Sequence, residues 1–502
     1  MAPTILKIAM IIKTDPLEFA SYLEDTSNLK GKASACYFPE SVQEVSQIVG
    51  DCYAKNIPFT CSGGRTGTTG GCVPLEGVLI SLERLNRINE IDVTAKTVRL
   101  EAGVSLKQLE QALPAGQAGL TFRPAPTESL AWLGGAVATC ASGTRGFGHG
   151  SVRAYVRALE IVLPGGGILN IRRGEIRSQG RVFDFAAGGR KYRFSVPSYN
   201  MPACKSQAGY FAAPDMDLID LFIGSEGTLG VVTALELELQ SRPFSIFDGL
   251  AFFTDEKKAF EFVETVKGLK AKKILRPASL EFLDANALGL AAGKFSFVSC
   301  LPAGRQAAVY FEQEADSVPE QARLLEQWAA LIDQSGALAD KTILADTPQE
   351  RETLYSFRHA LPETINEFLR AHGQVKAAAD IAVPDIAFPD MYAFYKEQAD
   401  KSGLEHVNFG HAGESHLHFN FLPKNEAQAI IAKEYLVLFC RKAVSLGGTV
   451  SAEHGIGKIK KPYLKIMYNP EELKQMAAVK KVFDPRGLLG SDNVLDKEVV
   501  CE

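Results

Sequence analysis

The chain lacks most of the short patterns that assign a protein to a class by themselves. Its nine cysteines, in 502 residues, stand singly without a Cys-x-x-Cys pair, so the usual spacings of iron–sulfur clusters and structural zinc sites are absent. Neither G-x-G-x-x-G nor G-x-x-x-x-G-K-[ST] occurs, which argues against a Rossmann dinucleotide site and against a P-loop. We therefore expect free thiols in a reducing compartment and no ATP hydrolysis.

Long apolar runs and basic clusters are missing too. The apolar stretch 8–12 is too short to span a bilayer and has no small-residue cleavage site behind it. The net charge is −5 and the pI is about 6.0, and without a basic stripe a nucleic-acid partner is not expected. These absences predict a cytoplasmic protein without a transmembrane segment, which could still dock at the inner face of a membrane. The oligomeric state stays open.

What is present indicates an α+β protein of two lobes, since 502 residues exceed what one hydrophobic core usually supports. Short strands at 77–82 and 97–103 and a hairpin signal at Gly165-Gly166 dominate the first part. Leu235, Leu237 and Leu239 alternate with polar residues, which predicts a half-buried antiparallel strand.

Longer helices appear after Pro243. They are predicted at 347–369 and 426–446, and Asn469-Pro470 opens another near the end of the chain. An earlier helix follows Ser41, which has a capping-box Glu44 three residues on. We place the domain boundaries to give 1–242, 243–460 and 461–502.

Glycine-rich loops are the most conspicuous feature of the first domain. The segment 62–71, SGGRTGTTGG, lets several backbone N–H groups point together at an anion without interference from Cβ atoms. Three further glycine-dense segments follow at 124–151, 163–167 and 223–233. One such loop could be a turn, but four in one domain suggest the walls around a large flat ligand with a diphosphate tail.

Three motifs, in their order along the chain, resemble the FAD-binding (PCMH-type) domain of the vanillyl-alcohol oxidase-type flavoproteins. They are SGGRTGTTGG, LGGAVATCASG and LFIGSEGTLGVVT. The whole of 36–495 is similar to their D-lactate dehydrogenase, glycolate oxidase and D-2-hydroxyglutarate dehydrogenase group. The resemblance implies an FAD-binding domain, then an α+β cap domain of the FAD-linked oxidases, and a C-terminal helix and tail that return to the first domain.

The same resemblance implies which residues bind FAD. Those around the diphosphate would be Gly63, Gly64, Arg65, Thr66, Gly67 and Thr69. Those along the rest of the cofactor would be Pro126, Thr127, Gly134, Gly135, Thr139, Ser142, Gly143 and Ser151. Those near its ribityl or adenine part would be Glu226, Gly230 and Val231. Ser62 and Arg65 depart from the family's usual residues. No side chain clearly matches the family's covalent flavin tethers, so the FAD is expected to be non-covalent.

Histidines are scarce, yet four of the eight lie between 411 and 454. Strand alternation puts His416, His418 and Asn420 on one face, and His411 precedes a loop that could bring it back to them. Glu453 arrives from a separate segment. Imidazole and carboxylate are usual ligands of zinc and similar divalent ions, so the pattern favours a metal site.

The family pattern, His-x-Gly-Asp-Gly-Asn-Leu-His followed by Glu-His-Gly, then implies the roles of these residues. His411, His418 and Glu453 correspond to its metal ligands, with zinc as the expected ion. Asn420 and His454 would lie beside the substrate, with His454 as general base, and Arg358 and Lys376 would bind the substrate carboxylate. This chain has Glu414-Ser415-His416 where the family has Asp-Gly-Asn.

The implied reaction is oxidation of a small D-2-hydroxy acid by hydride transfer to flavin N5. D-lactate is preferred because no obvious clamp for a second carboxylate is visible, and glycolate and D-2-hydroxyglutarate are the alternatives. Electrons would pass to a separate acceptor, which could be an iron–sulfur protein, an electron-transfer flavoprotein, a cytochrome or a quinone. Two other classes stay open: a metal-dependent hydrolase, which leaves the glycine loops unexplained, and a non-catalytic flavin electron-relay subunit, which has no use for the metal.

Overall fold

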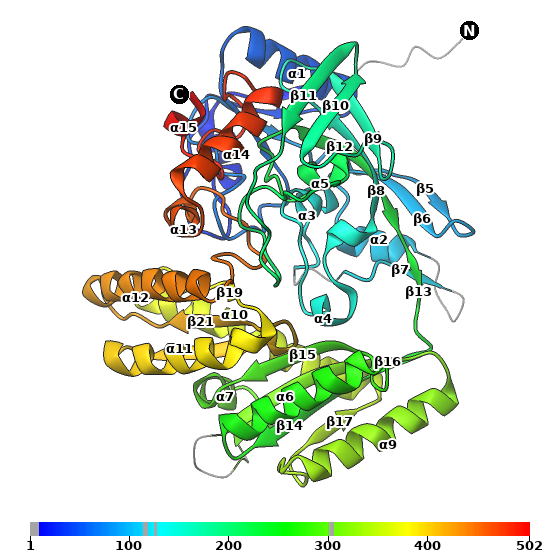
Figure 1. The fold of residues 1–502 in the computed structure, drawn as a ribbon, viewed down its shortest axis with the longest axis vertical. Coiled ribbons are helices and arrows are strands. Elements are labelled where there is room, and N and C mark those ends of the chain that lie inside the picture. Colours follow the sequence, from blue (N-terminus) through cyan, green and yellow to red (C-terminus); the bar gives the residue numbers. More distant parts are fainter. Residues whose placement is uncertain (1–9, 114–118, 125–127, 300, 302–305, 502) are drawn as a thin grey trace.

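The computed structural model describes residues 10–113, 119–124, 128–299, 301 and 306–501. This part of the chain forms two lobes, with the beginning and the end of the chain in the upper lobe and the middle of the chain in the lower one (Figure 1). The predicted α+β class is confirmed. No helix in the described ranges is both long enough and apolar enough to cross a membrane.

Two sheets form the centre of the upper lobe. The first has the order β1-β2-β4-β3, and its strands are β1 (Ile11–Lys13), β2 (Ala35–Phe38), β4 (Val78–Ser81) and β3 (Phe59–Ser62). The second, wholly antiparallel sheet has the order β5 (Ile88–Asp92), β6 (Thr97–Glu101), β12 (Val231–Glu238), β8 (Val156–Val162) and β9 (Ile168–Arg172). Two small pairs complete the lobe, β7 (Leu120–Thr121) with β13 (Gln240–Ser241) and β10 (Val182–Ala187) with β11 (Arg190–Ser195).

Short helices surround these sheets. They are η1 (Pro16–Tyr22), α1 (Val42–Ala54), α2 (Leu106–Ala112), α3 (Leu133–Ala138), α4 (Gly146–His149), η2 (Val152–Tyr155) and α5 (Leu218–Phe222). The predicted start of α1 is confirmed, because the Ser41 side chain accepts a hydrogen bond from the backbone N–H of Glu44. The predicted β8–β9 hairpin is confirmed as well: Gly165 and Gly166 both have positive φ, which glycine adopts without a steric cost.

The lower lobe is built on one eight-stranded sheet. Its path is β17 (Ile343–Ala345), β14 (Ser245–Phe253), β16 (Ala307–Ala315), β15 (Pro277–Leu283), β20 (His406–Gly410), β21 (His416–Phe421) and β18 (Ala377–Ala378), and β19 (Ile381–Ala382) also pairs with β21. Its helices are α6 (Glu256–Ala271), α7 (Ala285–Ala292), α8 (Ser296–Ser299), α9 (Val318–Gln334), α10 (Pro348–Ala371), η3 (Asp385–Ala387), α11 (Phe388–Ser402), η4 (Ala412–Glu414) and α12 (Glu426–Ser445). The helices α10 and α12 are the two that the sequence predicts.

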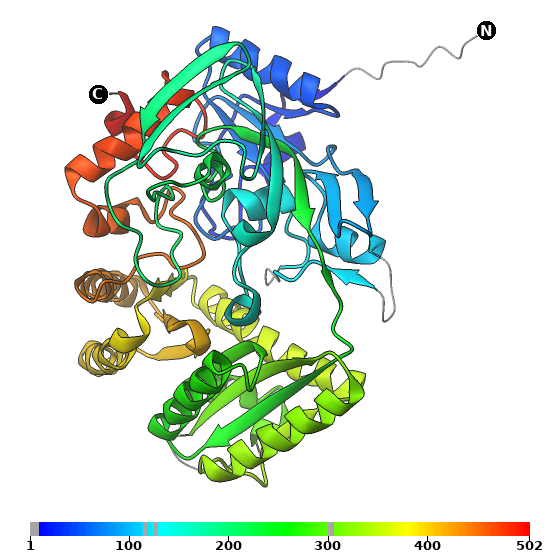
Figure 2. The same cartoon turned by 45° about the vertical axis from the view of Figure 1, so that its right-hand side comes forward.

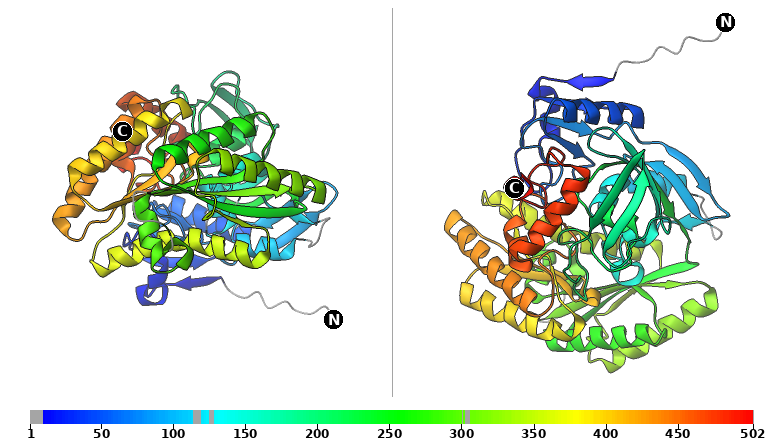
Figure 3. Two further views of the ribbon diagram at one scale, coloured as in Figure 1. Left: turned by 90° about the horizontal axis from the view of Figure 1, so that it is seen from below. Right: turned by 45° about the horizontal axis from the view of Figure 1, so that its top comes forward.

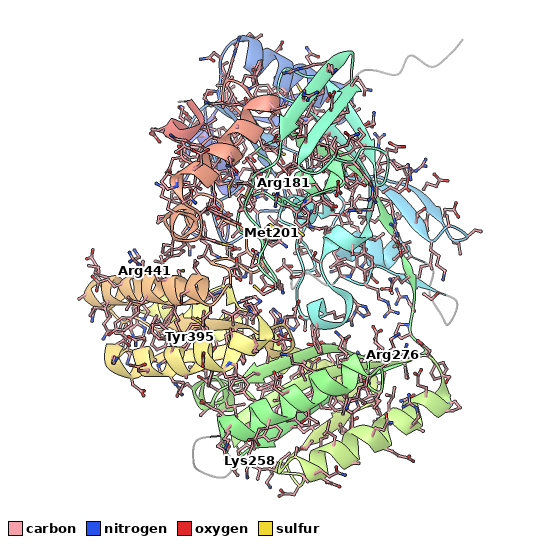
Figure 4. All side chains as sticks on the ribbon, viewed as in Figure 1. Arg181, Met201, Lys258, Arg276, Tyr395 and Arg441 are labelled. Carbon is pink, nitrogen blue, oxygen red and sulfur yellow. The ribbon has the colours of Figure 1, made fainter. Side chains whose placement is uncertain are left out.

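The outer face of this sheet is apolar and covered by helices. Seen from below, α6 and α9 cross one half of it (Figure 3), and Trp328 of α9 stacks on Phe311 with ring centroids 3.6 Å apart. The helices α11 and α12 cover the other half. Tyr395 of α11, labelled in Figure 4, packs against Phe419 of β21 and Phe439 of α12. Part of the opposite face packs against α7 and α10 through a second apolar cluster, and the rest carries polar side chains and is turned towards the upper lobe.

The chain crosses between the lobes twice. It descends through β12 and β13 into β14, as Figure 2 shows, and it returns after α12. The returned segment forms α13 (Lys461–Met467), α14 (Pro470–Phe483) and α15 (Lys497–Cys501). Beyond α14 it lies beside β3, where Phe59 donates its N–H to the carbonyl of Leu488 and accepts one from Gly490.

Candidate active site

Two strands of the lower sheet position the histidine cluster. β20 ends at Gly410, His411 precedes the one-turn helix η4, and Ser415, in the left-handed region, ends that helix just before β21 begins at His416. In β21 the apolar Leu417, Phe419 and Phe421 lie in the core under α11 and α12. The predicted alternation is confirmed, because His416, His418 and Asn420 share the opposite, inner face.

Glu453 lies at the centre of the cluster. Its Oε1 is 3.4 Å from His411 Nε2 and 3.2 Å from His418 Nε2. Donor atoms bound to a tetrahedral zinc ion at about 2.1 Å lie about 3.4 Å apart, so these spacings fit a metal ion between them. Both ring nitrogens of His411 are buried and make no hydrogen bond of good geometry.

A buried carboxylate, Asp380, lies behind this cluster. Its side chain accepts hydrogen bonds from Ser451 Oγ, from Lys460 Nζ and from the backbone N–H of His454. Its oxygens also lie 3.0 Å from His416 Nε2 and 3.3 Å from His454 Nδ1. Asp380 therefore fixes the orientation of two imidazoles, on separate segments, at once.

Burial and the surrounding charges set the protonation of the cluster. Burial disfavours the anionic form of Glu453, but Lys205 and His411 outweigh it and hold the pKa well below its usual range. Burial would lower the pKa of His411 too, but the neighbouring carboxylates raise it to about 9. Burial lowers the pKa of His416 and of His454 to about 3. Both imidazoles are therefore neutral in the protein.

The predicted carboxylate-binding arginine, Arg358 of α10, is 5% exposed and holds Glu281 of β15 by two hydrogen bonds, of 2.8 and 3.0 Å. Although burial opposes ionisation, Arg358 and His411 hold the pKa of Glu281 well below its usual range. The third guanidinium nitrogen, Nη1, is buried without a hydrogen-bond partner. One donor of Arg358 is therefore left for a further acceptor.

The other two predicted substrate residues differ in burial. Asn420 is fully buried, and its Oδ1 has no hydrogen-bond partner while its amide nitrogen donates to the carbonyl of His418. Lys376, just before β18, is exposed, although the surrounding protein lowers its pKa. His454 is 29% exposed at its side chain, and its ring stacks on that of His418. It is therefore the reachable imidazole of the group.

Sequence reasoning missed three charged residues of this site. Lys205, in the loop after β11, lies 2.8 Å from Glu453 Oε2 and 3.1 Å from Glu414 Oε2. Glu281 and Asp380 are the other two. Each stands in an ordinary strand or loop sequence, and only the order of the strands or the packing of the two lobes brings it to the histidines. Ser142, expected at the cofactor, donates its hydroxyl to Glu453 Oε2.

The glycine-rich loop 62–71 lies close to the histidine segment. Thr69 Oγ1 donates to the carbonyl of His454, and the Thr69 carbonyl accepts the N–H of Lys458. A Cβ added to Gly63 would lie 3.6 Å from the Cα of Gly135, at the start of α3, and one added to Gly135 would meet nothing within 4 Å. These glycines leave a bare backbone surface that fits a diphosphate group.

The remaining predicted cofactor residues are placed as follows. The carbonyls of Thr66 and Gly67 accept from Thr26, and the Arg65 guanidinium lies over the ring of Tyr22. Gly64 lies beside Trp132, and Gly134 packs on Ala102. Thr139 donates a hydrogen bond to the carbonyl of Gly135. Gly143 has a positive φ, and Ser151 Oγ lies 3.3 Å from Cys140 Sγ. Glu226 accepts the N–H groups of Ile456 and Gly457, whereas Gly230 and Val231 pack against β8. Pro126 and Thr127 lie outside the described residues.

Comparison with known protein families matches two separate segments of the chain. Residues 33–172 match the model of an FAD binding domain, and residues 248–494 match that of the FAD linked oxidases, C-terminal domain. The first segment contains the glycine-rich loop and α3. The second contains the histidines, Asp380, Glu281 and Arg358.

Curated relatives are similar over nearly the whole chain. A D-lactate dehydrogenase of Archaeoglobus fulgidus is 30% identical over 98% of this chain and 99% of its own length. Glycolate oxidase subunit GlcD of Bacillus subtilis is 30% identical over 94% and 91%, and a D-2-hydroxyglutarate dehydrogenase of Stutzerimonas stutzeri is 27% identical over 96% of both. Among solved structures, alkyldihydroxyacetonephosphate synthase superposes with a TM-score of 0.65 at 16% identity, over 95% of this chain and 82% of that one, so they share the fold.

Proposed function

This chain belongs to the FAD-linked oxidases, and we propose that it is a dehydrogenase that oxidises a small D-2-hydroxy acid to the 2-oxo acid. The observation that carries the proposal is the contact between the glycine-rich loop and the segment that carries the histidines. The glycine-rich loop touches the histidine segment through Thr69 and His454, so a flavin held by the first would lie beside the polar groups of the second.

The bare backbone around Gly63 and Gly135 supports FAD as the bound cofactor, and no covalent tether is proposed. His149, the nearest candidate for one, lies beside Glu314 instead. When bound, FAD supplies the acceptor for the hydride that leaves C2 of the substrate. The protein contributes orientation and charge.

A divalent ion would be held by His411, His418 and Glu453, with zinc as the ion we propose. Bound there, it supplies positive charge for the oxygen of the substrate hydroxyl. The free Nη1 of Arg358 would donate to the substrate carboxylate, and a charge-assisted hydrogen bond of this kind would orient the acid firmly. Asn420 and Lys376 would complete the binding of the acid.

His454 would accept the proton of the substrate hydroxyl. Its Nδ1 faces Asp380, which leaves Nε2 for the substrate, and its imidazole is neutral, as a proton acceptor must be. Asp380 would stabilise the imidazolium once the proton has arrived. This division of roles repeats the general pairing of a histidine base with an orienting carboxylate.

We propose D-lactate as the substrate, ahead of glycolate and D-2-hydroxyglutarate. Two further cations beside the cluster, Lys205 and Arg145, are already paired with carboxylates of the protein. They are therefore poor candidates for binding a second substrate carboxylate. The electrons would leave to a separate acceptor, and we propose a cytoplasmic enzyme that works either freely or at the membrane surface.

Substitution of His454 by alanine tests the assignment of the base. The variant should purify with as much FAD as the wild type, because no described contact of the His454 side chain involves the glycine-rich loops. Its flavin should be reduced by the substrate at least about 100-fold more slowly, the usual share of a general base. Stopped-flow absorbance under anaerobic conditions measures both values, and an unchanged rate of reduction would refute the role of His454.

A further inference from the structure

We propose that His416 is a fourth protein ligand of the metal ion, in addition to His411, His418 and Glu453. The inference rests on the metal site of the proposed function and extends it. One ligand atom from each of these four residues lies within 4.8 Å of the others, so a single ion can reach all four with small adjustments of the side chains.

The position of His416 in the fold supports this role. It starts β21, two residues before His418, so the pleat turns both imidazoles to the inner face. The rings of His416 and His418 have centroids 4.7 Å apart, and those of His416 and His411 5.2 Å. His416 thus stands beside both presumed histidine ligands.

The hydrogen bonding of His416 is otherwise hard to explain. The residue has no exposed surface, and its Nδ1 has no hydrogen-bond partner, while its Nε2 lies 3.0 Å from Asp380 Oδ1. Leaving a buried polar group unpaired costs about 1–3 kcal/mol. A leucine would fill the position without that cost, whereas a bound ion would satisfy one nitrogen outright.

Asp380 provides the outer partner that a histidine ligand usually has. Its Oδ1 lies 3.0 Å from His416 Nε2, and Lys460 and Ser451 hold the same carboxyl group from the other side. A carboxylate beside a ligating imidazole fixes its ring and raises its basicity as a ligand. Asp380 would then orient His416 as a metal ligand and His454 as the proton acceptor.

This ligand would distinguish the chain from the family pattern, which has asparagine at the position of His416. An amide oxygen is a poor ligand for zinc, whereas an imidazole is a good one. With these four residues holding the ion, one oxygen of the substrate would be its remaining ligand. The acid would then be held to the ion by one oxygen, with Arg358 holding its carboxylate.

The test compares wild type, His416→Asn and His406→Asn, each stripped of metal and reloaded with Zn²⁺. Asparagine is the family's own residue at 416, which keeps the fold. His406 on β20 is the control, because its ring stacks on Phe419 on the outer face. X-ray absorption spectroscopy counts the imidazole ligands, competition with a chelator gives the zinc affinity, and FAD content reports folding.

We expect three imidazoles in the wild type and in His406→Asn but two in His416→Asn, with the zinc affinity of the last at least tenfold weaker. If the wild-type protein showed only two imidazole ligands, or if His416→Asn bound zinc as tightly as the wild type, His416 would not be a ligand, although the metal site itself would stand. A wild type that binds no zinc would overturn the metal site itself. Flavin reduction by hydroxy acids tests the proposed oxidation independently of either result.

Discussion

Single buried charges determine much of the behaviour of this site. Arg358, Glu281 and His411 form a chain in which the glutamate lies between the guanidinium and the imidazole. The arginine is therefore held in one orientation before any substrate arrives. Two of its nitrogens bind Glu281 and only Nη1 is free, so the planar shape of the guanidinium matters as much as its charge.

Replacement of Arg358 by lysine should separate shape from charge. Lysine keeps the positive charge, but it cannot hold Glu281 by two nitrogens and still offer a third to the substrate. We expect the KM for the hydroxy acid to rise at least about tenfold, a loss of about 1.4 kcal/mol in binding. Steady-state kinetics measure it, with Arg276→Lys, at the outer surface, as the control. An unchanged KM would exclude Arg358 from carboxylate binding.

Asp248 of β14 should make the stability depend on pH. Burial and the nearby Glu312 raise its pKa to about 7, whereas in the unfolded chain the pKa is near 3.8. Between these values the folded protein binds the extra proton, so this carboxyl group stabilises the fold at low pH. The stabilisation is lost as the pH rises to about 7.

Asp248→Asn, which cannot ionise, should therefore have a higher Tm than the wild type, by a clearly larger margin at pH 8 than at pH 5. Each unit of pKa shift corresponds to about 1.4 kcal/mol, so the difference at pH 8 should amount to a few kcal/mol. Thermal unfolding at both pH values measures it, and Asp316→Asn, at an exposed site, is the control. Equal differences at both pH values would contradict the raised pKa.

At the scale of elements, local sequence signals predict the helices with clear caps and the strands with clear alternation. α1, α10, α14, the β8–β9 hairpin and β12 follow from such signals. The hairpin of β10 and β11 does not, because its stability comes from aromatic side chains that pack against Phe483 of α14, far along the sequence.

The residues of the candidate site also divide into those that the sequence predicts and those that it does not. His411, His418 and Glu453 are identified by their spacing and by resemblance to a family pattern. Lys205, Glu281 and Asp380 are not. The contacts of Glu281 and Asp380 depend on the order of the strands in the lower sheet, and those of Lys205 depend on the packing of one lobe against the other. A charge in a strand therefore predicts a site only once its neighbours in the sheet are known.

The helix α3 offers a matched pair of glycines. A Cβ at Gly134 would lie 2.5 Å from the Cβ of Ala102, whereas one at Gly135 would meet nothing within 4 Å. Gly134→Ala should therefore lower the stability by about 1–3 kcal/mol, the usual cost of overpacking. Gly135→Ala should fold normally but bind FAD more weakly, because its methyl group would stand in the proposed diphosphate site.

Thermal unfolding of the apoproteins and titration with FAD measure the two effects separately. The contrast itself is the test: if Gly135→Ala bound FAD with the affinity of the wild type, the start of α3 would not border the cofactor. If Gly134→Ala were as stable as the wild type, the close packing of α3 on the second sheet would be wrong.

At the scale of the whole molecule, buried ion pairs join the two lobes. Arg145 of the upper lobe holds Glu312 of β16 by two hydrogen bonds, and His149 lies beside Glu314. Lys205 bridges Glu414 of the lower lobe and Glu453 of the returning segment. The polar inner face of the lower sheet is thus tied to the loops that are proposed to bind FAD.

Lys205→Met should weaken this connection. It would leave Glu414 and Glu453 buried without their cation, and breaking a buried pair on one side costs about 3–5 kcal/mol. We expect the Tm of the metal-free protein to fall clearly, while Lys191→Met, at an exposed pair with Asp184, changes it little. A drop no larger than that of the control would show that Lys205 does not hold the lobes together.

The central claim is that the histidine segment presents a hydroxy acid to FAD held by the glycine-rich loops. The most direct measurement mixes the purified yellow protein, without oxygen, with the D and L forms of lactate and 2-hydroxyglutarate and with glycolate, and follows the flavin absorbance. We predict rapid bleaching by a D-2-hydroxy acid, with D-lactate fastest and the L forms inactive. A protein without FAD, or a flavin that none of these acids reduces, would contradict the claim.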